Sequence, residues 1–174
     1  QGCLDFDEDG YSNPDESWDE DNGADAFPQN PLQWSDFDGD GLGDNWGNST
    51  WLDRPETWPG EFIESVNQNE QDACPFQFGT SNQQGIYGCP DLDGDGWYDA
   101  IDDFVQEPSQ WRDSDRDGFG DNLEGFNGDY CPDITGTSNQ DRKGCLDTDG
   151  DGYSNIDEFW TKYSGGDVYP QDPL

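Results

Sequence analysis

An Asp-x-Asp-x-Asp-Gly pattern occurs five times in this chain and constrains its folding more than any other feature. The five acidic loops are residues 5–16, 36–47, 91–102, 113–124 and 147–158. Two unit charges about 5 Å apart repel by roughly 1 kcal/mol in water and by several in a less polar site, so each loop is poorly suited to fold alone. A positive charge among the carboxylates is therefore expected.

The spacing within the loops matches the oxygen ligands of calcium. In a twelve-residue calcium loop the ligands are side chains at positions 1, 3 and 5, the carbonyl at 7, a group at 9 that often acts through water, and a bidentate carboxylate at 12. Glycine at position 6 permits the sharp turn. Magnesium fits less well, because it demands near-ideal octahedral geometry and gives up water reluctantly. The pattern therefore predicts about five or more bound Ca²⁺.

The predicted ligands follow from these positions. They are Asp5, Asp7, Asp9, Tyr11, Asn13 and Glu16; Asp36, Asp38, Asp40, Leu42 and Asp44; Asp91, Asp93, Asp95, Trp97, Asp99 and Asp102; Asp113, Asp115, Asp117, Phe119, Asp121 and Glu124; and Asp147, Asp149, Asp151, Tyr153, Asn155 and Glu158. The first and last loops match the full pattern, with glutamate at position 12. Loop 36–47 has Gly47 there and needs a carboxylate from elsewhere, for which Asp25 and Asp53 are candidates.

The composition agrees with folding that depends on cations. Acidic residues number 42 against 6 basic ones, the formal charge is −36, and only 29% of the residues are hydrophobic. Such a chain would ordinarily be disordered, yet 14% of its residues are aromatic. Bound cations reconcile these facts, because their binding free energy can replace that of a large core. The charge excludes nucleic acid and anionic membranes as partners, and no apolar run predicts membrane insertion.

Internal repeats organise the chain. Two pairs of segments align without a gap, namely 2–32 with 144–174 and 25–45 with 102–122. The predicted units are 1–87 with an insertion at 46–72, then 88–143, and a partial third unit at 144–174. Glycine and proline recur too often for long helices or strands. We therefore expect a mostly irregular fold with little or no sheet and short helices, of which 60–71 and 155–163 are the best candidates.

The cysteines follow the same repeat. Residues 74–89 match residues 131–145, and each segment has a cysteine at both ends. We therefore predict the disulfides Cys74–Cys89 and Cys131–Cys145, which suit an oxidising compartment. Cys3 corresponds to the second cysteine of each pair, so its partner is expected upstream of residue 1.

The motifs resemble a known family. The segments "CPDLDGDGWYDAIDD" and "DSDRDGFGDN" resemble thrombospondin type 3 repeats, and "DGDGYSNIDEFW" resembles the half-EF-hand loops of dockerins and of bacterial and archaeal surface proteins. The resemblance covers nearly all of the chain except the insertion around 46–72. It implies a calcium-wrapped, disulfide-stapled and elongated extracellular or cell-surface array, with aspartates at positions 1, 3, 5 and often 9 as ligands.

The aromatic residues have structural and binding interpretations. Trp34 and Trp111 stand at equivalent repeat positions, two residues before a loop, which favours packing anchors over carbohydrate platforms. Trp46, Trp51 and Trp58 have no counterpart in the repeat and are the better candidates for a contact surface. A further candidate feature is a glycan at Asn48, which begins the Asn-Ser-Thr sequon.

Several functions are compatible with these features. A glycoside hydrolase would need a distinctive carboxylate pair, whereas the loops already account for many acidic residues. A calcium sensor would need paired helices and a methionine-rich groove, and the chain contains no Met. A dockerin-like docking module is the main alternative. We favour a non-enzymatic, extracellular, calcium-rigidified repeat rod that forms a stalk, an adhesin segment or a filament subunit.

Both ends of the chain interrupt the repeat. Gln1 stands just before a Gly-Cys pair whose preceding turn has no counterpart, and Leu174 stands where a Trp and a second loop would follow. We therefore expect the partners to be copies of the chain, or further repeats of the same chain, arranged head to tail.

Overall fold

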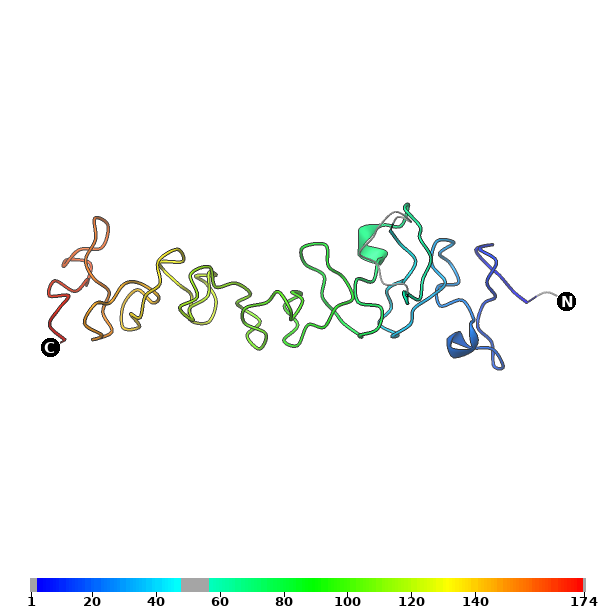
Figure 1. Cartoon of the computed structure of the whole chain (residues 1–174), viewed down its shortest axis with the longest axis horizontal. Helices are drawn as coiled ribbons and strands as arrows, with labels where there is room; N and C mark the ends of the chain where they lie inside the picture. Colours follow the sequence, from blue (N-terminus) through cyan, green and yellow to red (C-terminus); the bar gives the residue numbers. More distant parts are fainter. Residues whose placement is uncertain (1–2, 48–56, 174) are drawn as a thin grey trace. The chain divides into compact units, whose positions relative to one another are not determined.

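The computed structural model describes residues 3–47 and 57–173 and divides the chain into two compact units, Gln1–Asp99 and Ala100–Leu174. Helices within the described residues are limited to two short 3₁₀ helices, η1 (Glu20–Asn22) and η2 (Gln68–Glu70), and the β-pairing consists of isolated bridges (Figure 1). The prediction of a mostly irregular fold is confirmed. None of the described helices is long and apolar enough to cross a membrane.

The predicted helix at 155–163 is wrong, and the one at 60–71 is reduced to η2. In the first case the Asp157 carboxylate accepts the N–H groups of Phe159 and Trp160, both at 2.7 Å, so a local side-chain bond replaces the helical ladder. Phe159 is also 84% exposed and offers the segment no apolar packing. Short helices without such packing are marginal in water.

The interior of the described residues is polar rather than apolar. The buried hydrophobic residues there are Ala24, Val66, Cys89 and Cys145. Apart from glycines and Pro75, the other buried positions are occupied by aspartate, asparagine, glutamine and serine side chains: Asp25, Gln33, Asp44, Asn45, Asp72, Ser81, Asp102, Gln110, Asp129, Ser138 and Ser154. Hydrophobic burial alone therefore cannot account for the stability of this fold.

Both predicted disulfides, Cys74–Cys89 and Cys131–Cys145, are present, and Cys3 is free and exposed. The two cross-linked turns are built alike, because the N–H of the second cysteine donates to a serine hydroxyl, Ser81 at 3.0 Å in one turn and Ser138 at 2.9 Å in the other. The aligned segments thus reproduce one local structure.

The acidic loop that follows each cross-linked turn packs back onto it. The N–H groups of Asn82 and Gln83 donate to the Gly96 carbonyl at 2.8 and 3.0 Å, and those of Asn139 and Gln140 donate to the Gly152 carbonyl at 2.9 Å. The boundary between the compact units falls after Asp99 for this reason, inside loop 91–102 rather than at the end of a sequence repeat. The three sequence units themselves stay a prediction.

Two equivalent glutamines are completely buried. Gln110 donates from Nε2 to the carbonyls of Asn122 (2.8 Å) and Phe126 (3.0 Å) and accepts the N–H of Asn122 at Oε1 (3.0 Å). In the first unit Gln33 donates to the carbonyls of Asn45 and Glu70, both at 3.0 Å, and accepts the Asn45 N–H. Each glutamine therefore joins an acidic loop to the chain that follows it.

Replacement of Gln110 should be costly. The substitution Gln110→Ala removes the partner of three backbone groups, the Asn122 N–H and the carbonyls of Asn122 and Phe126, and we expect the free energy of unfolding in calcium to fall by about 2–4 kcal/mol. Denaturant titration measures the change, with Gln140→Ala at an exposed position of the same unit as the control. A loss below about 0.5 kcal/mol would show that these bonds contribute nothing to stability.

Candidate metal centres

The same backbone turn recurs in all five acidic loops. The glycine at position 6 has φ between 92° and 100°, in the left-handed region that glycine adopts without strain. Position 4 is also left-handed, which the motif did not predict. It is glycine in three loops, but Glu8 (φ 65°) and Arg116 (φ 66°) hold it in the other two. The turn is therefore a property of the loop rather than of glycine alone.

Backbone N–H groups fix the orientation of each loop carboxylate. In loop 147–158, Asp147 accepts from Gly150 at 2.8 Å through Oδ1 and from Gly152 at 2.9 Å through Oδ2. Asp149 accepts from Asp151 at 3.3 Å, and Asp151 accepts from Tyr153 at 2.8 Å. The same bonds occur in the other loops, where the position-7 donors are Tyr11, Leu42, Trp97 and Phe119.

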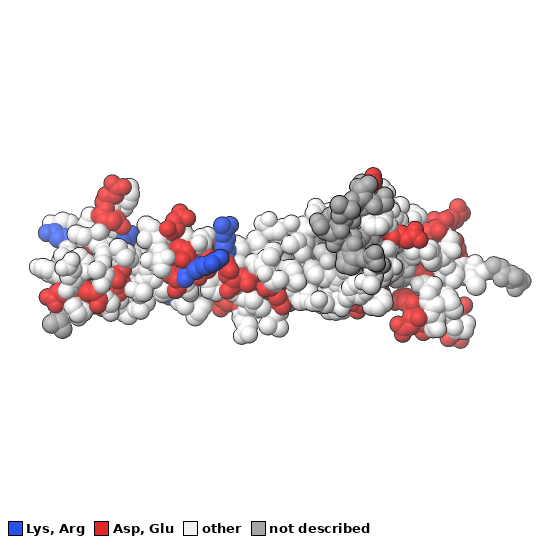
Figure 2. All heavy atoms as spheres, in the orientation of Figure 1, with Lys and Arg blue, Asp and Glu red and all other residues white. Residues whose placement is uncertain are grey.

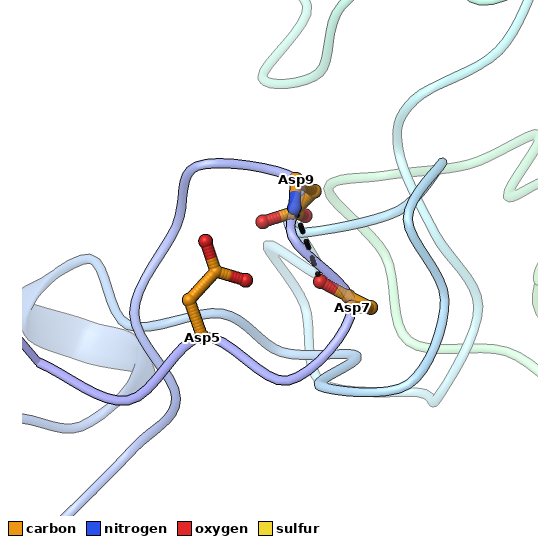
Figure 3. Close-up of side chains that lie close together, drawn as sticks. All are labelled: Asp5, Asp7 and Asp9. Atoms are coloured by element: carbon orange, nitrogen blue, oxygen red, sulfur yellow. Dashed lines mark hydrogen bonds between the residues drawn. The ribbon is translucent and has the colours of Figure 1, made fainter.

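The aspartates at positions 1, 3 and 5 form five clusters. In each cluster one carboxylate oxygen from every member lies within 4.8 Å of the others. Figure 3 shows the first cluster, where Asp5, Asp7 and Asp9 point toward one another across the loop and the Asp9 N–H donates to Asp7. The other clusters are Asp36, Asp38 and Asp40; Asp91, Asp93 and Asp95; Asp113, Asp115 and Asp117; and Asp147, Asp149 and Asp151.

The side chain at position 9 closes the loop. The N–H of Asn155 donates to the Leu146 carbonyl at 2.7 Å, while its Oδ1 accepts the N–H of Thr148 at 3.2 Å. The equivalent residues Asn13, Asp44, Asp99 and Asp121 make both bonds in their own loops. The residue at position 9 therefore brings the beginning and the end of the loop together, and its role as a ligand stays a prediction.

The glutamates at position 12 lie outside the clusters. Glu16, Glu124 and Glu158 are exposed, and none of them belongs to a group of three carboxylates among the described residues. In this structure the three glutamates therefore stand apart from the aspartate clusters, and their role as ligands stays a prediction.

A second set of aspartates accompanies the loops instead, and we call Asp25, Asp72, Asp129 and Asp167 the trailing aspartates. The N–H of each donates to the carbonyl at loop position 8, which is Ser12, Gly43, Gly120 and Ser154, respectively, at 2.8–3.0 Å. Oδ1 of each accepts the N–H two residues later, from Phe27, Cys74, Cys131 and Tyr169, at 2.7–2.8 Å.

The trailing aspartates share a sequence pattern that could have revealed three of them. Each begins an Asp-x-(Phe, Cys or Tyr)-Pro segment. Only Asp25 was predicted from the sequence, as a candidate for loop 36–47 with Asp53 as the alternative. In the structure Asp25 bonds to loop 5–16, loop 36–47 is joined by Asp72, and Asp53 lies outside the described residues.

Many buried carboxylate oxygens have no hydrogen-bond partner. They include Oδ2 of Asp7, Asp9, Asp93, Asp95 and Asp149 in the loops and Oδ2 of all four trailing aspartates. Buried polar atoms in proteins almost always have a partner, and an anionic oxygen without one is costly. The donors are carboxylate oxygens, the ligands that hard cations such as Ca²⁺ prefer. The residues present therefore fit a calcium ion in each loop.

Three of the trailing aspartates also have raised pKa values. Burial, together with the nearby charges of Asp40, Asp38 and Asp44, raises the pKa of Asp72 to about 8 against the lowering effect of the Cys74 N–H. Burial likewise raises the pKa of Asp25 and Asp129 to about 6, with the aspartates of loops 5–16 and 113–124 as additional causes. Without a cation, the folded chain therefore favours protons on these groups.

The described tryptophans of the insertion pack against loop 36–47. The Trp46 indole donates to the Asp72 carbonyl at 2.6 Å, the Trp58 indole donates to the Asp44 carbonyl at 2.8 Å, and the two rings meet edge to face at 5.5 Å. Both side chains hold the loop through their indole N–H groups, and a contact surface at these two residues stays a prediction. Trp51 and the candidate glycan site Asn48 lie outside the described residues.

Trp34 serves as a packing anchor. Its ring stacks on Tyr11, with centroids 4.8 Å apart and an angle of 11° between the planes. Tyr11 is position 7 of loop 5–16, and Trp34 precedes loop 36–47, so the stack connects two successive loops in the first unit. Trp111 is half-buried in the second unit.

Basic side chains are too few to neutralise the loops. Those of the described residues are Arg112, Arg116, Arg142, Lys143 and Lys162, all in the second unit, and Figure 2 shows acidic side chains in both units. Two ion pairs form there, Arg112–Asp121 at 3.4 Å and Arg142–Asp157 at 2.8 Å. Among its described residues, the first unit has no basic side chain to compensate its clusters.

Comparison with protein-family models gives no match, and comparison with curated protein sequences also gives none.

Proposed function

We propose that the chain is an extracellular structural protein whose fold is held by about five or more calcium ions. The observation that carries this proposal is the five-fold recurrence of one loop geometry, in which three carboxylates converge. The partnerless buried oxygens in and beside these loops support it. Calcium would supply the coordination that these oxygens lack and the free energy that an apolar core does not.

The extracellular part of the proposal rests on redox chemistry and on ion supply. The disulfides Cys74–Cys89 and Cys131–Cys145 form in oxidising compartments. Calcium sites of extracellular modules typically have dissociation constants of roughly 10⁻⁴–10⁻³ M, which suits loops that lack strong helical support. The resemblance to thrombospondin type 3 repeats agrees with both points.

The structural role is favoured over a docking or sensing role by how the loops are built. Sensors and dockerin-like modules act through helices that flank their loops. Here the segment after loop position 9 turns on local side-chain bonds, as at Asp157, rather than entering a helix. In our proposal each loop instead stiffens the chain locally, and successive loops form a stalk, an adhesin segment or a filament subunit that joins its neighbours head to tail.

Small-angle X-ray scattering tests the proposed rod. In millimolar calcium we expect a distance distribution with the long tail of an elongated particle, and after chelation we expect the profile of an expanded, unfolded chain. A compact globular particle in calcium would contradict the rod and favour a docking module.

A further inference from the structure

We infer that the trailing aspartates Asp25, Asp72, Asp129 and Asp167 supply the carboxylate ligand that a standard calcium loop has at position 12. This inference rests on the proposed binding of calcium and names residues that the loop pattern does not contain. In each of these four loops the ligand set would then be drawn from two separate segments of the chain.

The first argument is the path of the chain after position 9. In loop 5–16 the N–H of Asp15 donates to the Trp18 carbonyl at 2.8 Å, and in loop 147–158 the N–H of Asp157 donates to the Trp160 carbonyl at 2.8 Å. These equivalent turns include Glu16 and Glu158, whose side chains are exposed. The position-12 glutamates are therefore directed by their own turns and not by the cluster.

The second argument is the attachment of the trailing aspartates to the loops. The bond from each trailing N–H to the position-8 carbonyl places the residue beside the loop, next to the predicted carbonyl ligand at position 7. Because Oδ1 is held by the N–H two residues later, Oδ2 is the oxygen that stays available. It is buried and has no partner in all four cases.

The third argument is direct proximity in loop 36–47. A Cβ atom added at Gly88 would lie 2.3 Å from Asp72 Oδ1 and 2.9 Å from Asp40 Oδ2, so both carboxylates converge on the space beside this glycine. Asp72 is fully buried. It therefore approaches the position-5 ligand from a segment that lies far along the sequence.

Loop 91–102 explains how this arrangement relates to the standard pattern. Its position-12 residue is Asp102, and Asp102 Oδ1 accepts the N–H of Phe104 at 2.7 Å, which is the bond that every trailing aspartate makes. The trailing aspartates correspond to this residue after extra chain has been inserted behind the loop. The residues between position 12 and the trailing aspartate are 17–24, 48–71, 125–128 and 159–166.

The inference changes what each ion holds together. A ligand inside a twelve-residue loop orders only that loop, whereas a ligand at a trailing aspartate also closes the inserted segment between them. Calcium would thus join parts of the folded chain that are far apart in sequence, and its binding free energy would offset the entropy of closing the inserted segments.

Two matched pairs of substitutions in the full chain test the inference. Asp25→Asn and Asp167→Asn keep the oxygen that accepts the local N–H but remove the charge, while Glu16→Gln and Glu158→Gln make the same change at position 12 of the same loops. Calcium binding is measured by isothermal titration calorimetry and by competition with a chromophoric chelator. Each aspartate variant should weaken one site by roughly 100-fold, since ligand charge sets the affinity of such sites. Each glutamate variant should change affinity by less than about threefold.

The outcomes separate the inference from the proposed function. Loss of a site in Glu16→Gln or Glu158→Gln, with the aspartate variants unchanged, would restore position 12 and overturn the inference. Five undiminished sites in both aspartate variants would overturn it as well. Near-ultraviolet circular dichroism at saturating calcium identifies any variant that fails to fold. If one does, the matched aspartate and glutamate variants of the other loop provide the test. A wild-type chain that takes up no calcium would refute the proposed function itself.

Discussion

Removal of calcium at neutral pH is expected to unfold the chain. With a dissociation constant of about 10⁻⁴ M, one site stabilises the folded state by about 2.7 kcal/mol in about 10 mM calcium, so five such sites together contribute an amount comparable to the roughly 5–15 kcal/mol of a typical domain. The described interior offers little to replace that contribution, because its buried hydrophobic residues are Ala24, Val66 and two cysteines. The disulfides would survive chelation and keep the two short turns closed.

Tryptophan fluorescence and near-ultraviolet circular dichroism measure this transition. Trp46 and Trp58 are sensitive reporters, because their indole N–H groups bind backbone carbonyls of Asp72 and Asp44 beside loop 36–47. We expect a red shift of the emission and loss of the aromatic signal in excess chelator, both reversed by added calcium. Magnesium at the same concentration serves as the control. Spectra that stay unchanged in excess chelator would show that the fold does not depend on cations.

The pH dependence of stability should have opposite signs with and without calcium. In the metal-free chain the pKa of Asp72 is raised to about 8, and those of Asp25, Asp40, Asp44 and Asp129 are raised to about 6, in each case chiefly by burial. The folded state therefore binds protons more tightly than the unfolded state, where the aspartate pKa has its ordinary value of 3.8. The free energy of unfolding of the metal-free chain should fall as pH rises from about 4 to about 8.

In calcium the same carboxylates must be ionised in order to bind the ion. Protons then compete with calcium, so the free energy of unfolding should fall as the pH is lowered below neutrality. Thermal unfolding of calcium-loaded chain at pH 5 and pH 7.5 measures one slope, and the folded fraction of resin-stripped chain, followed by near-ultraviolet circular dichroism from about pH 4 to neutrality, measures the other. Slopes of the same sign in the two states would contradict calcium binding by these carboxylates.

The substitution Asp72→Asn provides a control for the pH argument. It removes the carboxyl group whose pKa burial raises to about 8 and keeps the side-chain oxygen that accepts the Cys74 N–H. At neutral pH the variant should stabilise the metal-free chain by a few kcal/mol, because it removes a buried charge, and should destabilise the calcium-loaded chain. A change of the same sign in both states would show that Asp72 acts only as a packing residue.

The parts of the structure that the sequence predicts well are those set by local geometry. Aspartates at alternate positions followed by glycine can meet the backbone N–H groups of their own turn, so Asp147, Asp149 and Asp151 converge without help from distant residues. The disulfides were predictable because the two segments that contain them repeat. Neither prediction depends on contacts with residues far along the sequence.

The parts that the sequence did not predict depend on chain inserted between interacting residues. Asp72 joins loop 36–47 only after the insertion that contains Trp46 and Trp58, and no fixed spacing links it to the motif. The glutamine bonds of Gln33 and Gln110 span similar insertions. At 155–163 the apolar spacing favoured a helix, but the Asp157 carboxylate took the N–H groups of the first turn. Because this segment packs no apolar face, the local hydrogen bonds to Asp157 determine its structure.

Native mass spectrometry of the metal-free chain, titrated with calcium, tests most directly whether calcium holds this fold. It counts the ions on each molecule and reports folding through the charge-state distribution of the same molecules. We predict uptake of at least five calcium ions per chain, one for each cluster of three aspartates, together with a shift to the low charge states of a folded protein. Uptake of fewer than five ions at saturation, or a folded charge-state distribution before any ion is bound, would contradict this prediction.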